Sequence, residues 1–171
     1  MEELAEEKHE YCDGRIHAMA GARDEHELVA GNFFAELLRG VRGSGCRAYK
    51  SDMKVRATAA FRDKVFFYYP DVFVACGPVE ARTAYRDDPK LIVEVLSEDW
   101  KKDLAEKLTI YRNIPALEEY VVADPAAEAP EVFIYRRADG WEPPEVVTGM
   151  SAEFTLRSVG LTLKVADLFA V

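Results

Sequence analysis

The sequence predicts a single domain of the α/β or α+β class, in which helices pack on a β-sheet. Its 171 residues suffice for one domain with a sizeable core, but not for two ordinary ones. The composition, 49% hydrophobic and 31% charged, is that of a globular protein. Segments with the apolar spacing of helices alternate with short apolar runs that are typical of strands. We therefore expect one domain over residues 1–171, with a core from about residue 11 to 125 and a C-terminal β-extension from about 130 to 171.

The N-terminal elements follow from charge, turn and periodicity signals. Residues 1–10 are predicted to form a charged helix, and residues 11–19 a hairpin around an Asp-Gly turn. The first long helix is predicted over Asp24–Arg42, because Asp24 is a suitable N-cap with Glu27 three residues later. Apolar residues follow at helical spacing, which indicates that one face of this helix is buried.

Strands are predicted after this helix, over Ala48–Arg56, Val65–Tyr69 and Val72–Ala75. The polar stretch Gly77–Pro89 is expected to be a loop. The run Leu91–Leu96 (LIVEVL) is almost entirely apolar, which is typical of a strand buried on both faces.

The second half of the chain begins with a helix predicted over Asp99–Asn113, which Pro115 prevents from continuing. A strand is predicted over Glu119–Ala123. The remaining segments are predicted to form four short strands and one terminal helix: Val132–Arg136, Trp141–Val147, Glu153–Leu156, Leu161–Val165 and Ala166–Phe169.

The net charge of −9 comes from 22 Lys and Arg against 31 Asp and Glu. A protein that coats nucleic acid regardless of sequence relies on cations to neutralise phosphates, so the charge argues against that class. It leaves room for a local basic groove.

The cysteines Cys12, Cys46 and Cys76 are odd in number and far apart, which fits neither a disulfide framework nor a Cys-x-x-Cys metal site. We expect them to be small buried hydrophobic residues, and the compartment to be the reducing cytoplasm. The acidic N-terminus lacks an apolar segment, and no run approaches roughly 18 apolar residues. Neither a signal peptide nor a membrane span is therefore expected.

Glu94 is the most informative charged residue, because it lies in the middle of the apolar run Leu91–Leu96. Side chains alternate between the faces of a strand, so Glu94 shares a face with Ile92 and Leu96. An unpaired buried carboxylate would cost several kcal/mol, and a cation, a metal ion or a proton must compensate it. The alternative is that Glu94 lies at an exposed sheet edge or pairs with an arginine.

Asp71 and Lys107 also have apolar neighbours. Asp71 follows Pro70 at the start of the apolar stretch VFVA; its alternative role is that of a turn residue accepting backbone hydrogen bonds. Lys107 shares a helix face with apolar residues, and its alternative role is an exposed ion pair with Asp103, four residues earlier.

Together, Asp71, Glu94 and Lys107 suit metal-assisted hydrolysis. Two carboxylates on adjacent strands can hold a hard divalent cation such as Mg²⁺. A nearby ammonium can orient a water or help to deprotonate it, and can stabilise the charge that builds on an attacked phosphate. The three residues therefore point to phosphodiester hydrolysis.

Longer segments carry these residues in a family pattern: YCDGRIHAMAG, YPDVFVACG and PKLIVEVLSEDWKKDLAEKLTIYRNIPALEEYVVADP. They closely resemble the Uma-two type of bacterial restriction endonucleases (domain of unknown function 820), in the PD-(D/E)XK nuclease superfamily. The resemblance runs through most of the chain. It implies a restriction-endonuclease-like PD-(D/E)XK core, with a mixed central sheet flanked by helices and extra C-terminal β-strands.

By this resemblance Asp71 matches the aspartate of the PD motif, and Glu94 matches the acidic residue of the second half-motif. Leu96 stands where the general superfamily pattern has lysine, and Lys107 matches the position from which this family supplies it. The resemblance implies that Asp71, Glu94 and the Val95 backbone carbonyl bind Mg²⁺, with Mn²⁺ as a substitute. It also implies that Lys107 orients or activates the attacking water.

Three residues are candidate accessory groups: His26, Asp103 and Tyr111. His26 could approach the site from the first helix, although a histidine on a helix surface is usually only solvated. Asp103 and Tyr111 complete the D-xxx-K-xxx-Y pattern of the second helix, where Tyr111 is expected to pack or to hydrogen-bond a site residue.

Basic residues flank the candidate site in sequence, because residues 39–64 hold eight Lys and Arg against two Asp. Lys101 and Lys102 begin the helix that bears Lys107. The candidate nucleic-acid contacts are Lys54, Arg56, Lys101 and Lys102. The alternative is that these are scattered solvating charges.

The leading function is thus a Mg²⁺-dependent endonuclease acting on DNA, for which double-stranded substrate is expected. Duplex cleavage favours two symmetric sites, so a homodimer is expected as well. The alternative is a catalytically weak or inactive nuclease-fold protein that binds nucleic acid or serves as an assembly module. A third reading is a small-molecule hydrolase that uses the same carboxylates.

Overall fold

The computed structural model describes residues 9–12, 15–18, 24–59, 64–79, 83–97 and 100–170. The N-terminal hairpin is confirmed in its strands, because β1 (His9–Cys12) pairs antiparallel with β2 (Arg15–Ala18). Its turn lies outside the described residues. So does most of the helix expected over residues 1–10, whose last two residues belong to β1 instead.

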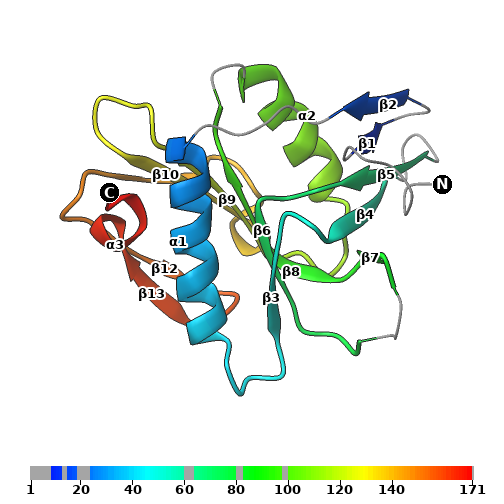
Figure 1. Cartoon of the computed structure of the whole chain (residues 1–171), viewed down its shortest axis with the longest axis horizontal. Coiled ribbons are helices and arrows are strands. Elements are labelled where there is room, and N and C mark those ends of the chain that lie inside the picture. The colour runs from blue at the N-terminus through cyan, green and yellow to red at the C-terminus, as the bar shows by residue number, and fades with distance from the viewer. Residues whose placement is uncertain are drawn as a thin grey trace.

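In the described part of the chain, the central sheet has six strands in the order β11-β10-β9-β8-β6-β3 (Figure 1). Strands β8 and β9 run parallel, whereas the other neighbouring pairs run antiparallel. The sheet is therefore mixed, as expected. Its strands are β3 (Arg47–Lys50), β6 (Val72–Ala75), β8 (Pro89–Val95), β9 (Glu119–Asp124), β10 (Glu131–Arg136) and β11 (Glu145–Thr148).

One face of the central sheet is covered by helix α1 (Asp24–Gly40), which starts where predicted and ends two residues earlier (Figure 1). The short helix α3 (Val165–Phe169) packs beside α1. Alternate residues of the strands form an apolar core with these helices, among them Val93 of β8 and Phe33 of α1. Burial of these apolar side chains supplies most of the free energy that holds α1 against the sheet.

A second sheet and helix α2 (Trp100–Tyr111) lie against the other face of the central sheet. The order of this sheet within the described residues is β2-β1-β5-β4-β7. Val55 and Phe66 point from it into a second apolar core, together with Ile92 of β8 and Ile114, which follows α2. Its remaining strands are β4 (Lys54–Ala59), β5 (Lys64–Tyr68) and β7 (Tyr85–Arg86). β7 lies in the stretch expected to be a loop.

The single strand predicted over residues 48–56 is wrong, because the chain turns at Ser51–Met53 and changes sheet. The Met53 amide donates to the Lys50 carbonyl at 3.1 Å, which closes the turn. β3 then pairs with β6 of the central sheet, while β4 pairs with β5 of the second sheet. Continuous β-propensity does not reveal such a change of partner.

The C-terminal elements are confirmed apart from the start of one strand. The strand predicted from Trp141 begins only at Glu145, because Pro143 and Pro144 lack the amide hydrogens that a strand ladder needs. Hairpin β12 (Glu153–Leu156) with β13 (Leu161–Lys164) and helix α3 follow as predicted.

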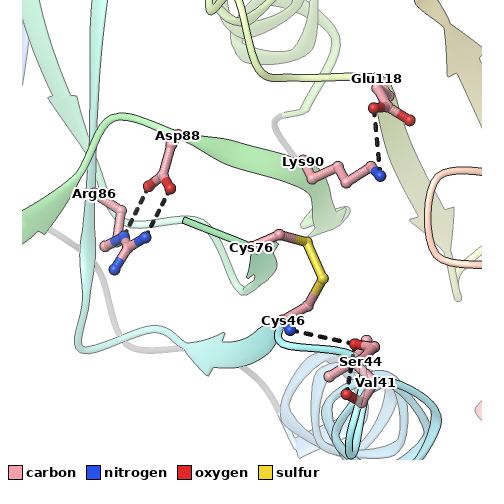
Figure 2. Close-up of a disulfide and its surroundings, with 8 residues drawn as sticks. All are labelled: Val41, Ser44, Cys46, Cys76, Arg86, Asp88, Lys90 and Glu118. Carbon is pink, nitrogen blue, oxygen red and sulfur yellow. Dashed lines mark hydrogen bonds and ion pairs between the residues drawn. A yellow bond between two sulfur atoms is a disulfide. The ribbon is translucent and has the colours of Figure 1, made fainter. Parts of the chain in front are cut away.

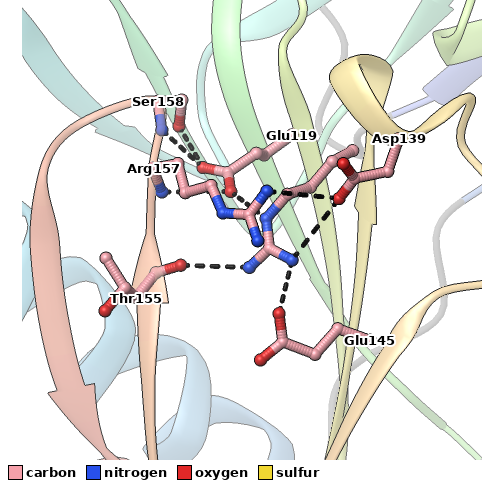
Figure 3. Close-up of polar contacts among 7 residues, drawn as sticks. Glu119, Asp139, Glu145, Thr155, Arg157 and Ser158 are labelled. Atoms are coloured by element: carbon pink, nitrogen blue, oxygen red, sulfur yellow. Dashed lines mark hydrogen bonds and ion pairs between the residues drawn. The ribbon is translucent and has the colours of Figure 1, made fainter.

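A buried polar network fastens the C-terminal hairpin to the central sheet (Figure 3). Glu119 of β9 is only 2% exposed and accepts hydrogen bonds from Arg136 Nε at 2.8 Å and from the Ser158 amide at 2.8 Å. Arg136 also donates to the carboxylate of Glu145 and to the carbonyl of Thr155. Because each buried charge has several partners, the network satisfies its polar groups while it holds three segments together.

Cys46 and Cys76 form a disulfide with a Cα–Cα distance of 3.9 Å, so the expectation that both are unpaired hydrophobic residues is wrong (Figure 2). The strand register explains the pairing: Arg47 of β3 lies opposite Ala75 of β6, which makes the two cysteines the next opposed pair. Their separation of 30 residues in sequence hid this proximity. The side chain of Cys12 lies outside the described residues.

Candidate active site

Four elements converge at the end of the central sheet where β6 begins and β8 ends. Asp71 immediately precedes β6, and Glu94 lies near the end of β8. Lys107 and Tyr111 come from α2 on one side of the sheet, and His26 comes from the first turn of α1 on the other side. Residues that are distant in sequence thus meet at one place.

Glu94 is buried on the α2 side of the sheet, with 7% of its surface exposed. Its Oε1 lies 3.2 Å from Lys107 Nζ and accepts a hydrogen bond from the Tyr111 hydroxyl at 3.0 Å. Ile92 and Leu96 belong to the apolar core on the same side, as the strand alternation predicts. The alternative of an exposed edge or an arginine partner is therefore wrong, because the compensating cation is Lys107.

Lys107 is itself 9% exposed, which contradicts the alternative of an exposed ion pair on the helix surface. Its Nζ also lies 5.7 Å from the ring centroid of Tyr68, within the range of a cation–π contact. The side chain of Asp103, its alternative partner, lies outside the described residues. Lys107 is thus held between an aromatic face and a buried carboxylate.

Asp71 connects β6 to β8 and to α1. Its Oδ2 accepts a hydrogen bond from the Val95 amide at 2.7 Å and lies 3.2 Å from His26 Nε2. The donor on Val95 is 24 residues away in sequence. Asp71 is therefore not the local turn residue of the alternative interpretation. Its other oxygen, Oδ1, has no hydrogen-bond partner in the part of the chain that the structure describes.

The electrostatic environment of His26 is set by carboxylates. The hydrogen bond with Asp71 raises the pKa of the imidazole above its usual value, and burial opposes this rise. The charges of Asp71, Glu27 and Glu94 raise the pKa further. This end of the sheet is consequently a place where positive charge is favoured.

The candidate nucleic-acid contacts are only partly brought to this site. Lys54 Nζ lies 5.5 Å from the ring centroid of Tyr69, two residues before Asp71. Arg56 instead pairs with Asp87 at 2.5 Å on the second sheet. The side chains of Lys101 and Lys102 lie outside the described residues.

Comparison with known proteins identifies the family. The sequence matches the Uma2 family, described as "Putative restriction endonuclease", over residues 1–166. The chain belongs to the Uma2 family. Two Synechocystis proteins are similar to it: slr1290 is 29% identical over 170 residues, covering 98% of this chain and 86% of that one. The second, sll1609, is 30% identical over 131 residues, covering 72% and 70% respectively.

A solved structure supports the fold of this Uma2 protein. It is a "putative nuclease belonging to DUF820" from Anabaena variabilis, with a TM-score of 0.72 and 21% sequence identity. The match covers 97% of this chain and 92% of the other. The predicted restriction-endonuclease-like fold is thereby confirmed.

The donors of this Uma2 site are oxygen and imidazole groups that divalent cations accept as ligands. Among the described residues, no three His, Cys, Asp or Glu side chains are already grouped as a metal site. Instead, Lys107 and Tyr111 contact Glu94, and His26 contacts Asp71. The donor types fit a divalent cation. Such a cation would take the place of the Lys107 ammonium and the Tyr111 hydroxyl at Glu94, and of the His26 N–H at Asp71.

The close contact of His26 with Asp71 differs from the solvated position expected of a histidine on a helix surface. A signal for it exists, because Val29, Ala30 and Phe33 are buried at positions three, four and seven residues after His26. These spacings put His26 on the buried face of α1 rather than on its solvent face.

Proposed function

We propose that this Uma2 protein is a divalent-metal-dependent endonuclease that hydrolyses phosphodiester bonds of DNA. The observation that carries the proposal is the meeting of Asp71, Glu94 and Lys107 at one end of the central sheet, with Lys107 Nζ at 3.2 Å from Glu94. Two acidic groups and an ammonium at the end of adjacent strands form an economical site for phosphoryl transfer to water. Family membership supports the nuclease class.

In this proposal Asp71, Glu94 and the Val95 carbonyl would hold Mg²⁺, with Mn²⁺ as a substitute. A bound divalent cation lowers the pKa of water and stabilises charge on the attacked phosphate. Lys107 orients the attacking water and places its positive charge near the phosphate oxygens. Water attacks phosphorus in line with the departing sugar oxygen, so that one P–O bond forms as the other breaks. The attacking water loses a proton to solvent, and the sugar oxygen takes up a proton from solvent.

The Asp71–Val95 and Tyr111–Glu94 hydrogen bonds position the two carboxylates for this chemistry. Asp71 is fixed to the β8 backbone, and Glu94 is fixed to α2. Their relative placement therefore depends on the packing of β6, β8 and α2 rather than on flexible loops. Such preorganisation reduces the reorganisation that hydrolysis requires.

The proposal is tested with supercoiled plasmid DNA and Mg²⁺ or Mn²⁺. We expect nicked or linear product, and a decrease in rate of about 10²- to 10³-fold for Asp71→Asn, Glu94→Gln and Lys107→Met. Glu153→Gln and Lys164→Met are matched controls, because these residues form an exposed pair on the β12–β13 hairpin. Circular dichroism confirms that each variant is folded. Cleavage by Asp71→Asn at the wild-type rate would refute the proposed site.

A non-catalytic function is the second candidate. The observation that favours it is that Lys107 and Tyr111 already occupy Glu94 Oε1, without a preformed metal cluster among the described residues. A nuclease-fold protein of this kind would bind nucleic acid or serve as an assembly module. Retained DNA binding without cleavage, and without any effect of Mg²⁺ or Mn²⁺ on the melting temperature, would favour this candidate.

We further propose that the protein binds double-stranded DNA as a homodimer in the cytoplasm, with Lys54, which lies over the ring of Tyr69, near the substrate. The described residues include no helix that is long and apolar enough to cross a membrane. Reducing compartments seldom maintain a disulfide such as Cys46–Cys76, so the cytoplasmic location depends on whether this bond forms in the cell. Sedimentation measures the oligomeric state, and thiol alkylation during rapid lysis shows whether this bond exists in the cell.

A further inference from the structure

We infer that His26 is a third protein ligand of the proposed metal site, and that this ligand selects a divalent first-row transition ion over Mg²⁺. The inference rests on the proposed function, because it concerns the cation that Asp71 and Glu94 would bind. It adds a nitrogen donor to a set otherwise made of oxygen atoms.

The placement of His26 is the first support. The residue lies in the first turn of α1, and the contacts of α1 with β6 and β8 hold that turn over the end of the central sheet. Only 15% of the His26 side chain is exposed, and its Nε2 faces Asp71. A rigid helix packed on the core thus directs the imidazole to the proposed metal ligand.

The distance between the two groups is the second support. His26 Nε2 lies 3.2 Å from Asp71 Oδ2. Two adjacent ligands of an octahedral ion with metal–ligand bonds of about 2.1 Å lie about 3.0 Å apart. Both groups can therefore bind one ion after a movement of a few tenths of an ångström. A bound ion would stand in place of the proton between Nε2 and Oδ2, and that proton would pass to solvent.

The remaining polar atoms of the pair are the third support. His26 Nδ1 is buried without a hydrogen-bond partner in the described part of the chain, so the imidazole makes its polar contact through Nε2 alone. Asp71 Oδ1 also lacks a hydrogen-bond partner there. Asp71 Oδ1 therefore leaves an oxygen ligand open beside the oxygen that Nε2 contacts. Nδ1 lies on the other edge of the imidazole and takes no part in the proposed site.

The choice of ion follows from the ligand types. Mg²⁺ takes oxygen ligands and retains several waters, whereas imidazole suits the first-row transition ions. One imidazole together with two carboxylates is a mixed set that favours the first-row ions over Mg²⁺, and Mn²⁺, the weakest binder of that series, is the most stringent probe of this preference. We therefore expect the site to bind Mn²⁺ at least about tenfold more tightly than Mg²⁺.

The test measures binding of Mn²⁺ and of Mg²⁺ by calorimetry on the full chain, without DNA. His26→Gln is the decisive variant, because its side-chain amide can still donate to Asp71 but is a poor transition-metal ligand. We expect it to stay folded, to lose at least about tenfold in Mn²⁺ affinity and to keep its Mg²⁺ affinity. Glu25→Gln, an exposed neighbour on α1, is the control that should bind both ions as the wild type does.

Electron spin-echo spectroscopy of bound Mn²⁺ provides an independent readout. Modulation from a coordinated imidazole nitrogen is expected in the wild type and should vanish in His26→Gln. If His26→Gln retains the wild-type preference for Mn²⁺, the inference is wrong while the proposed function stands. If Asp71→Asn does not weaken the binding of either ion, or if the wild type binds neither, the proposed function fails as well.

Discussion

Glu94 and Lys107 form the pair with the largest consequence for stability at the candidate site. Both side chains are nearly fully buried, at 10% and 11% exposure, and their charged atoms lie 3.2 Å apart. Two buried charges that neutralise each other add little net stability, but removal of one leaves the other uncompensated. The Tyr111 hydroxyl also donates a hydrogen bond to the Glu94 carboxylate.

We predict that Lys107→Met lowers the free energy of unfolding by about 3–5 kcal/mol, because it leaves Glu94 as a buried unpaired carboxylate. Glu94→Gln combined with Lys107→Met should recover much of this loss, since the amide needs no counter-ion. Urea denaturation of the two single variants and the double variant measures the coupling energy. Additive losses would show that the two side chains do not stabilise each other.

His26 makes stability depend on pH, because its pKa is raised in the folded protein by Asp71. A raised folded-state pKa stabilises the fold fully below the unfolded value of about 6.5, and this contribution is lost as pH rises through the folded-state pKa. We predict that, without added metal, the stability difference between wild type and His26→Gln shrinks as pH rises above 6.5. Denaturation midpoints from pH 5.5 to 8.5 check this, and a difference that grows with pH would contradict it.

At the scale of elements, the sequence indicates where strands lie more readily than which strands pair. Leu91–Leu96 and its alternation around Glu94 could be predicted, since burial of a strand leaves a period of two in the sequence. The turn at Ser51–Met53 and the register of β3 on β6 could not, because both depend on contacts distant in sequence. The same holds for the His26–Asp71 contact, which needs α1 to be docked on the sheet.

The disulfide ties the edge strand β3 to β6 at the end opposite Asp71. It closes a loop with a sequence separation of 30 residues. A cross-link of that length restricts the unfolded chain enough to contribute about 3–4 kcal/mol.

We predict that the double variant Cys46→Ser with Cys76→Ser is less stable than the oxidised wild type by about that amount. A reductant should lower the denaturation midpoint of the wild type and leave the variant unchanged. Because the bond lies away from the candidate site, the proposed DNA cleavage should survive its loss under conditions where the protein stays folded. Equal stability of the wild type with and without reductant would contradict the prediction.

At the scale of the whole molecule, the structure shows how the net charge of −9 bears on the attraction of DNA. Part of the basic stretch over residues 39–64 is neutralised locally, by Lys50 with Glu27 and by Arg56 with Asp87. Long-range attraction of DNA is therefore weak, and substrate binding would depend on the metal and on short-range contacts near Asp71.

The network around Glu119 connects the C-terminal extension to the rest of the chain. β10 and β11 come from the C-terminal extension, yet they continue the same sheet beyond β9, and Arg136 and Ser158 are the partners of Glu119. Truncation near residue 130 would open the edge of β9 and remove Arg136, Arg157 and Ser158, the residues that donate hydrogen bonds to Glu119. We therefore expect the extension to belong to the same cooperative folding unit, so that a fragment ending near residue 130 does not fold on its own.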